Sequence, residues 1–330
     1  MAFIFLLFFS PAVWRIAVNH IIFIMRCSYF IVLYILMPLC AISQRTQKDR
    51  AAIDLKGPVK EMILRSYAAV DNFGKLSKGE RINENGSYLF NAAGNLLEQN
   101  IYNKNGSLRA RHTYNYDKAG QLQEQHIFNP GGGMRTKLRY RYNADGLLQE
   151  QLLYLPDGKL QSKYLYGYQQ QLQTGYSWYN ADGGLEERAV YNYNDKGNQI
   201  SLVSYSNADS ILQQLQWHYD EQGNIVAQTA FENNHITETI TYAYDAKGLT
   251  TLVLVKNEAG ISTRHIRYQY DAAGRLIQET WLDAEEKELD NYTSKYETDR
   301  QQNWVKKTTW RNGVPVSVTE RELYYFKIKK

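Results

Sequence analysis

Cysteine is nearly absent from this chain of 330 residues, and both examples, Cys27 and Cys40, lie within the first 43 residues. From Gln44 onward there is no thiol, which excludes disulfides and thiolate metal sites from the rest of the chain. No GxSxG, HExxH, Walker or GxGxxG phrase occurs, so the common motif-bearing enzyme classes have no support. We therefore expect a protein that is not an enzyme and holds no cofactor and no metal.

Net charge is also small. Residues 1–43 contain Arg15 and Arg26 and no acidic residue, so the remainder carries 36 Lys or Arg against 34 Asp or Glu, a net charge of +2. This balance, without a basic patch interleaved with the aromatic residues, argues against a nucleic-acid partner. The partner is unknown from sequence, and a cell-surface glycan or an envelope protein is the expected class.

The apolar leader, 1–43, has the pattern of an export signal. From Met25 it reads MRCSYFIVLYILMPLCAISQ, with a basic start, an apolar stretch and small residues at Ala41 and Ser43. Met25 is a second candidate for the true start. Cleavage after Ser43, retention as a membrane anchor and lipoprotein processing at Cys40 all stay open, although Leu39 fits the last poorly. The expected location is the periplasm, cell surface or extracellular space, with or without a tether.

An aromatic residue returns every 25 or 26 residues, and a Gly follows most of these markers by four positions. The markers are Phe90, Tyr116, Tyr142, Tyr168, Tyr193, Tyr219, Tyr244, Tyr270 and Tyr296. The glycines are Gly94, Gly120, Gly146, Gly197, Gly223, Gly248 and Gly274. A second aromatic set lies between the markers: Tyr102, Phe128, Tyr154, Tyr179, Tyr205 and Phe231. The module is therefore about 13 residues, which suits one strand and one turn.

The register of the hairpins follows from the turn. Lys118-Ala119-Gly120 predicts a three-residue loop in which Gly120 has positive φ and Asp117 bonds the turn backbone. The predicted pairs are Tyr116–Leu122, Tyr114–Glu124, His112–His126 and Ala110–Phe128. Every even-numbered residue in this stretch, including its aromatic residues of both sets, would then lie on one face. The two 25-residue steps fall within 168–173 and 231–236, which are predicted turns, so the lost residue need not invert a strand.

These observations predict an all-β fold, a long, twisted and coiled antiparallel sheet of about nine 26-residue units and roughly 18 strands. A sheet of that width cannot stay flat, and its aromatic face is expected to turn inward. Whether the coil is open or closed stays undecided. A lipid-facing outer-membrane barrel is the architectural rival, but strand centres carry residues such as Glu124 and His126, and both sets of turns are short.

The phrase aromatic-Asp/Asn-x-x-Gly-x-Leu resembles the YD repeats of RHS-type proteins, in the longer-period form of secreted Bacteroidetes proteins. The resemblance covers 88–311, with 44–87 as a linker and N-terminal capping strands and 312–330 as a C-terminal capping strand and basic tail. In larger RHS relatives such repeats wind into a shell around a toxin domain. This chain shows no autocleavage motif, so a toxin-associated shell fragment is a secondary expectation.

Few residues stand out as ligand sites. Trp178 and Tyr179, in GYSWYNADGGLEE, resemble the aromatic hairpins of choline-binding repeats and could stack on a sugar or quaternary amine. His112 and His126, with Glu124, form a weak zinc candidate against a simple His pair. Acidic turn residues such as Asp117 fit turn chemistry better than calcium ligation. The leading interpretation is an exported, non-enzymatic scaffold, with a glycan-binding module using exposed Trp and Tyr as the alternative.

Overall fold

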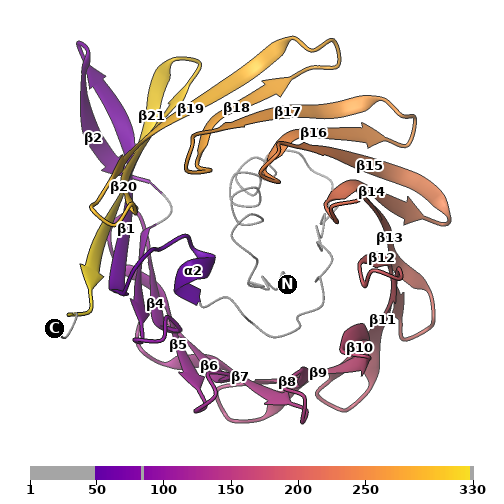
Figure 1. Cartoon of the computed structure of the whole chain (residues 1–330). Helices are drawn as coiled ribbons and strands as arrows, with labels where there is room; N and C mark the ends of the chain where they lie inside the picture. The colour runs from indigo at the N-terminus through magenta and orange to yellow at the C-terminus, as the bar shows by residue number, and fades with distance from the viewer. Residues whose placement is uncertain (1–48, 83–84, 328–330) are drawn as a thin grey trace.

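The computed structural model describes residues 49–82 and 85–327, so the predicted leader lies outside the described part. The fold is all-β, as predicted, and 21 antiparallel strands form one sheet (Figure 1). One helical turn, α2 (Asp49–Ala52), precedes them, and no helix of the described residues is long and apolar enough to cross a membrane. The strands are β1 (Val59–Asn72), β2 (Lys75–Arg81), β3 (Asn85–Phe90), β4 (Leu96–Tyr102), β5 (Leu108–Tyr116), β6 (Leu122–Phe128), β7 (Met134–Tyr142), β8 (Leu148–Tyr154), β9 (Leu160–Gln169), β10 (Leu172–Asn180), β11 (Leu185–Tyr193), β12 (Gln199–Ser206), β13 (Ile211–Tyr219), β14 (Ile225–Glu232), β15 (His235–Tyr244), β16 (Thr250–Asn257), β17 (Ser262–Tyr270), β18 (Leu276–Leu282), β19 (Glu288–Thr298), β20 (Trp304–Arg311) and β21 (Val314–Tyr325).

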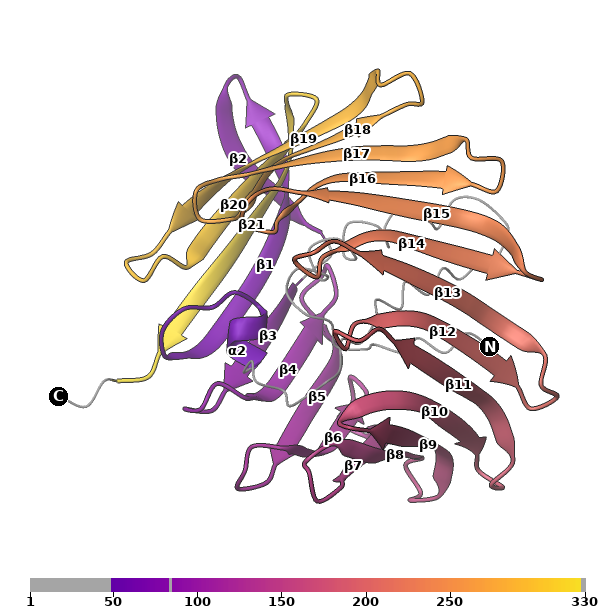
Figure 2. The same cartoon turned by 45° about the vertical axis from the view of Figure 1, so that its right-hand side comes forward.

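The sheet closes on itself, which is more specific than the coiled sheet expected from sequence. β1 pairs with β21 on one side and with β3 on the other, so 20 of the 21 strands of the described residues form a barrel, and β2 alone among them stands outside the ring (Figures 1 and 2). β2 pairs with the C-terminal half of β1 and forms a hairpin with it. Closure pairs every strand of the ring on both sides, which accommodates the twist that a sheet this wide accumulates.

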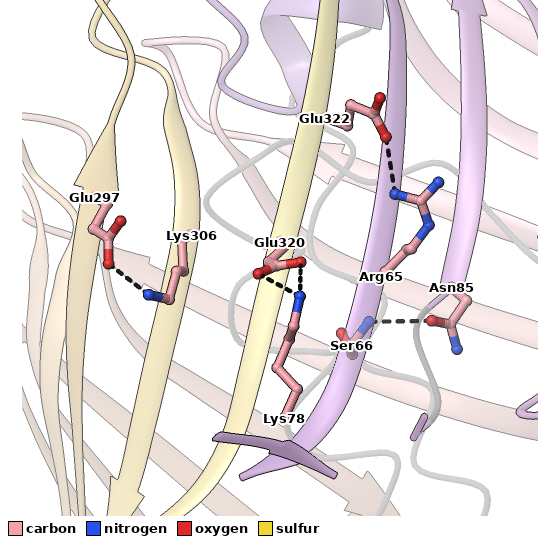
Figure 3. Close-up of polar contacts among 8 residues, drawn as sticks. All are labelled: Arg65, Ser66, Lys78, Asn85, Glu297, Lys306, Glu320 and Glu322. Carbon is pink, nitrogen blue, oxygen red and sulfur yellow. Dashed lines mark hydrogen bonds and ion pairs between the residues drawn. The ribbon is translucent and has the colours of Figure 1, made fainter. Parts of the chain in front are cut away.

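Charged pairs flank the closing seam (Figure 3). Arg65 of β1 lies 2.9 Å from Glu322 of β21, and Lys78 of β2 reaches over to Glu320 at 3.0 Å. On the β3 side, the Ser66 amide donates to Asn85 Oδ1 at 3.1 Å. The ion pairs are about a third to a half exposed, so each contributes less than about 1 kcal/mol. The seam therefore depends mainly on the nine residue pairs between β1 and β21.

Each hairpin contains an irregularity that the predicted register missed. Tyr116 does lie opposite Leu122, as predicted, but the next pair is Asn115 with Glu124, so Gln123 is left over as a bulge. The predicted pairs Tyr114–Glu124, His112–His126 and Ala110–Phe128 are therefore wrong, and Tyr114 lies opposite Gln125 instead. One extra residue shifts the alternation by one and reverses which residues face which side.

The bulges send the two aromatic sets to opposite faces, so the prediction of a single shared aromatic face is wrong. Tyr116 faces the inside of the ring, where its hydroxyl lies 2.8 Å from Asp49 Oδ2 of α2. Phe128 lies opposite Arg111, which is on the same outward face of β5 as Asn115. The markers therefore line the lumen, and the intervening aromatic residues lie on the outer surface.

The two 25-residue steps fall at two-residue turns, as predicted. Gln170 and Gln171 have φ of 49° and 66°, and Asn233 and Asn234 have φ of 50° and 64°. Two successive positive φ values define the type I′ turn that suits a two-residue hairpin loop. Gln169 then pairs with Leu172, and Glu232 with His235, so the lost residue comes out of the loop and the strands keep their faces.

A chain of hydrogen bonds explains why eight of the nine markers are Tyr. Each marker hydroxyl donates to the backbone carbonyl of the residue that lies opposite the preceding marker, next to its bulge. The bonds measure 2.6–2.9 Å and join Tyr116–Leu96, Tyr142–Leu122, Tyr168–Leu148, Tyr193–Gln173, Tyr219–Gln199, Tyr244–Ile225, Tyr270–Thr250 and Tyr296–Leu276. We call this series the tyrosine latches. A bulge interrupts the ladder, and the hydroxyl satisfies the carbonyl beside it.

Candidate functional site

The lumen wall of β9, β10 and β11 holds the densest aromatic cluster among the described residues. The Tyr164 ring lies 6.0 Å from the Trp178 indole with their planes within 10° of each other. Tyr166 lies 6.4 Å from Tyr164 and is also nearly parallel to it, whereas Tyr176 is tilted at 5.9 Å. Tyr191 meets Tyr176 edge to face at 6.4 Å. These residues share the lumen face because they alternate in phase with the marker tyrosines of β9 and β11.

Hydrogen bonding in this cluster is incomplete. The Tyr176 hydroxyl donates to the Glu187 carboxylate, which lies opposite Trp178 on β11. The indole Nε1 of Trp178 is buried and has no hydrogen-bond partner. Trp281, at the corresponding position of β18, differs because its Nε1 donates to Glu279 Oε1 at 2.6 Å. The indole N–H of Trp281 thus has a hydrogen-bond acceptor and that of Trp178 has none, so the two residues can be compared directly.

The phenols of the cluster stay protonated over the usual pH range. Burial raises the pKa of Tyr166, Tyr176 and Tyr191 well above the ordinary phenol value. Each hydroxyl can therefore donate one hydrogen bond and accept others. Flat rings, phenol hydroxyls and one carboxylate make a wall that can contact an apolar face and polar groups of one ligand at once.

Tyr179 does not belong to this cluster, although the sequence suggested that it could act together with Trp178. The two are consecutive residues of β10, so they point to opposite faces. Tyr179 lies on the outer surface, where the Lys163 ammonium sits 4.9 Å from its ring centre. One ligand cannot stack on both rings. The departure from the repeat at 168–187 indicated the correct strands, but the bulge at Glu186 of β11, opposite Trp178 and Tyr179, was not predicted.

The outer surface of β5 to β9 interleaves cations with aromatic rings, so the expectation that no such patch exists is wrong. Arg111 lies 5.5 Å from the Phe128 ring centre, and both Lys137 and Arg139 lie within 5.7 Å of Tyr154. The bulges produce this arrangement by bringing the second aromatic set to the charged face. Ion pairs at strand centres, such as Arg139–Glu124 at 2.7 Å, also differ from the apolar band of lipid-facing strands.

The predicted pairing of His112 with His126 is not formed, so neither a His pair nor the zinc candidate exists there. His112 lies opposite Ile127 in the lumen, whereas His126 faces outward and contacts Glu124 at 3.2 Å. The bulge at Gln123 separates them by reversing the alternation of β6. Among residues 49–82 and 85–327, no three His, Cys, Asp or Glu side chains are placed to hold a metal ion.

The Gly and Asp residues predicted to form the turns have the expected roles, with positive φ at the Gly and a backbone hydrogen bond to the Asp. Gly120 has φ of 83°, and Asp117 Oδ1 accepts from the Gln121 amide at 2.9 Å. The other glycines named from the repeat have φ of 74–91°: Gly94, Gly146, Gly197, Gly223, Gly248 and Gly274. Left-handed φ strains any residue with a Cβ, which explains the recurring Gly. Asp220 shows the use of the acidic turn residues, since its two oxygens accept from the amide and the side chain of Asn224.

Two shallow cavities lie at turns and away from the aromatic cluster. One, of about 370 Å³, is lined by residues of 194–200 and 217–220, including Asp195, His218 and Asp220. The hydrogen bond from the Asn224 side chain holds the pKa of Asp220 below its usual value. The second, of about 460 Å³, lies among 288–293 and 312–313. Because the Asp220 carboxylate is engaged by its own turn, the first cavity offers no free acid–base pair.

No protein-family model and no curated protein matches this sequence. Among solved structures the fold is similar to the TcdB2–TccC3 toxin chain, with a TM-score of 0.40 and 17% identity over 80% of this chain and 16% of that chain. It is also similar to the Photorhabdus luminescens Tc holotoxin pore (TM-score 0.38, 16% identity, 76% and 15%). A porin-like protein from Bacteroides uniformis gives a TM-score of 0.33 and 10% identity, over 82% of this chain and 99% of that one. The chain spans about a sixth of the length of the toxin chains it matches.

Proposed function

We propose that this chain is an exported, non-enzymatic repeat protein that acts as a structural or binding scaffold at the cell envelope or surface. The observation that carries the proposal is closure of the sheet, because it creates a continuous wall with distinct inner and outer side-chain surfaces. Repeat folds offer such surfaces, and their use depends on the side chains they carry. Carboxylates of the lumen, Glu187 and Glu279, serve as acceptors for Tyr176 and Trp281, which is a structural use.

Protease shaving of intact cells, followed by fractionation, tests the location. A surface protein should disappear when trypsin is added to whole cells, and a periplasmic one only after the outer membrane is opened. Either result supports export. Recovery of the full-length, protected protein with the cytosolic fraction would contradict the proposal.

We propose glycan binding as a second candidate function, with the site at the lumen wall around Trp178, since Trp178 and Tyr179 face opposite sides. The unpartnered indole N–H favours it, because a buried donor without an acceptor costs roughly 1–3 kcal/mol and a sugar oxygen would remove that cost. A quaternary ammonium group has no acceptor, so the same observation favours a sugar over choline.

An oligosaccharide array with the purified protein tests this second function, with choline chloride as competitor. For any sugar that binds, Trp178→Phe keeps an aromatic ring and removes the donor, and should weaken binding about threefold to tenfold. Trp281→Phe is the matched control and should leave affinity unchanged, since its donor is already used by Glu279. Equal affinities of both variants, or competition by choline alone, would contradict a sugar site at Trp178.

A further inference from the structure

The outer wall of β5 to β9 carries a two-dimensional field of cations. Lys137 and Arg139 point outward from β7 together with Arg141, two residues apart and therefore about 7 Å from one another along the strand. Arg111 of β5 and Lys163 of β9 extend the field over five strands, or about 19 Å. The field lies on the outer side of a closed ring, so it is convex around the ring (Figure 1).

Charge is distributed unequally around the ring. Residues 96–171, which form β4 to β9 and their turns, contain ten Lys or Arg and six Asp or Glu, a net charge of +4. Residues 172–257, which form β10 to β16, contain four Lys or Arg and ten Asp or Glu, a net charge of −6. One side of the molecule is thus electropositive and the neighbouring side electronegative, although the whole chain carries only +4. Such a distribution orients the molecule in front of a charged surface.

Part of the positive charge is compensated locally. Arg111, Arg139 and Arg141 lie 2.7–2.8 Å from the carboxylates of Glu98, Glu124 and Glu150. The side chain of Arg141 is 64% exposed and those of Arg111 and Arg139 nearly half exposed, so their remaining N–H groups face solvent. Lys163 has no carboxylate partner among these and lies over the Tyr179 ring.

We propose that this wall docks onto the anionic headgroups of a lipid membrane. A flat array of anionic phosphates matches a broad convex field better than a single linear polyanion does, because a linear chain needs a groove to engage cations of five strands. One guanidinium group can donate two parallel hydrogen bonds to two oxygens of a phosphate. Tyr residues are enriched at the membrane–water interface. The inference rests on the proposed envelope location but is tested independently of it, with purified components.

Flotation with phosphatidylcholine vesicles, with or without 30% phosphatidylglycerol, measures the docking. The protein should float with the anionic vesicles at 50 mM NaCl and be released at 500 mM, since salt screens exposed charges. Arg139→Gln combined with Arg141→Gln should weaken binding about tenfold or more, because each cation near an anionic surface contributes roughly 1 kcal/mol. The matched control is Lys247→Gln with Lys256→Gln, which removes two exposed charges from the electronegative side, one in the 245–249 turn and one on β16, and should change binding less than about twofold.

Three outcomes would overturn the proposal. The first is the absence of binding to anionic vesicles by the wild-type protein at low salt. The second is an equal loss in the two double variants when both unfold at the wild-type temperature, since net charge alone would then account for binding. The third is binding to immobilised polygalacturonate or duplex DNA without binding to vesicles, which would assign the wall to a soluble polyanion.

Discussion

The two rims of the barrel are made by the same repeat but hold their aromatic residues differently. At the first rim, with turns such as 117–121 and 194–198, marker tyrosines face the lumen and form the latches. At the second rim, with turns such as 129–133 and 155–159, aromatic residues face solvent and hold Arg or Lys over their rings. A hydroxyl on the lumen side must find an acceptor within the protein, whereas an outward hydroxyl is satisfied by water. The face therefore decides what a repeated Tyr does.

The largest difference between the rims should come from removing hydroxyls. Tyr219→Phe combined with Tyr244→Phe removes two latches and leaves the carbonyls of Gln199 and Ile225 without them. We expect a loss of about 2–4 kcal/mol in the free energy of unfolding, measured with urea. The outward pair, Tyr179→Phe with Tyr205→Phe, should lose less than about 1 kcal/mol. Similar losses in the two double variants would show that the latch hydrogen bonds stabilise the fold no more than the outward hydroxyls do.

The turns should respond alike at both rims, because they share one backbone geometry. Gly120 of the first rim and Gly158 of the second have φ of 83° and 82°. Val at either position should cost about 1–2 kcal/mol, since a Cβ strains the left-handed region. Gly131→Val is the control, because Gly131 has no positive φ and an added Cβ meets nothing within 4 Å. Unchanged melting temperatures for Gly120→Val and Gly158→Val would contradict the loop assignment.

A smaller effect separates the two lumen tryptophans. Trp281→Phe removes the donor to buried Glu279 and should cost about 1–2 kcal/mol of unfolding free energy. Trp178→Phe removes a donor that has no acceptor and should leave stability unchanged or slightly higher. Calorimetry of both variants without any ligand measures the difference. Destabilisation by Trp178→Phe equal to that by Trp281→Phe would show that the Trp178 nitrogen is satisfied after all.

The last expected difference is confined to alkaline solution. Burial raises the pKa of Tyr244 to about 12 from an ordinary value near 10. Because the folded-state pKa is the higher one, the stabilisation is complete below pH 10 and is lost as the pH rises from 10 to about 12. Tyr244→Phe should therefore flatten the fall in unfolding free energy between pH 9 and pH 11. An unchanged slope in Tyr244→Phe would count against burial of this hydroxyl as the cause.

The sequence predicted the strands and turns well because each depends on local chemistry. Gly120 and Asp117 mark a hairpin by themselves, and the 25-residue steps located the two-residue loops at Gln170 and Asn233. The bulge at Gln123 could not be predicted in this way, because a bulge leaves the spacing of the markers unchanged. The extra residue at each such turn determines which aromatic set faces the lumen. Tyr179 was mispredicted for a simpler reason, because it follows Trp178 directly in β10 and strand alternation places the two side chains on opposite faces. Closure was also beyond local patterns, since it joins β1 and β21 from the two ends of the described chain.

The tyrosine latches have a consequence for how such a chain can change in size. Each donor lies 19 or 20 residues after its acceptor, so a segment of about 26 residues contains one donor for the unit before it and one acceptor for the unit after it. Duplication of a complete unit would insert two strands and one new latch while leaving the existing latches paired. Duplication of half a unit would place a tyrosine on the wrong face. The ring can therefore grow only by whole two-strand units. Its circumference can increase in this way while the existing strands keep their side-chain contacts.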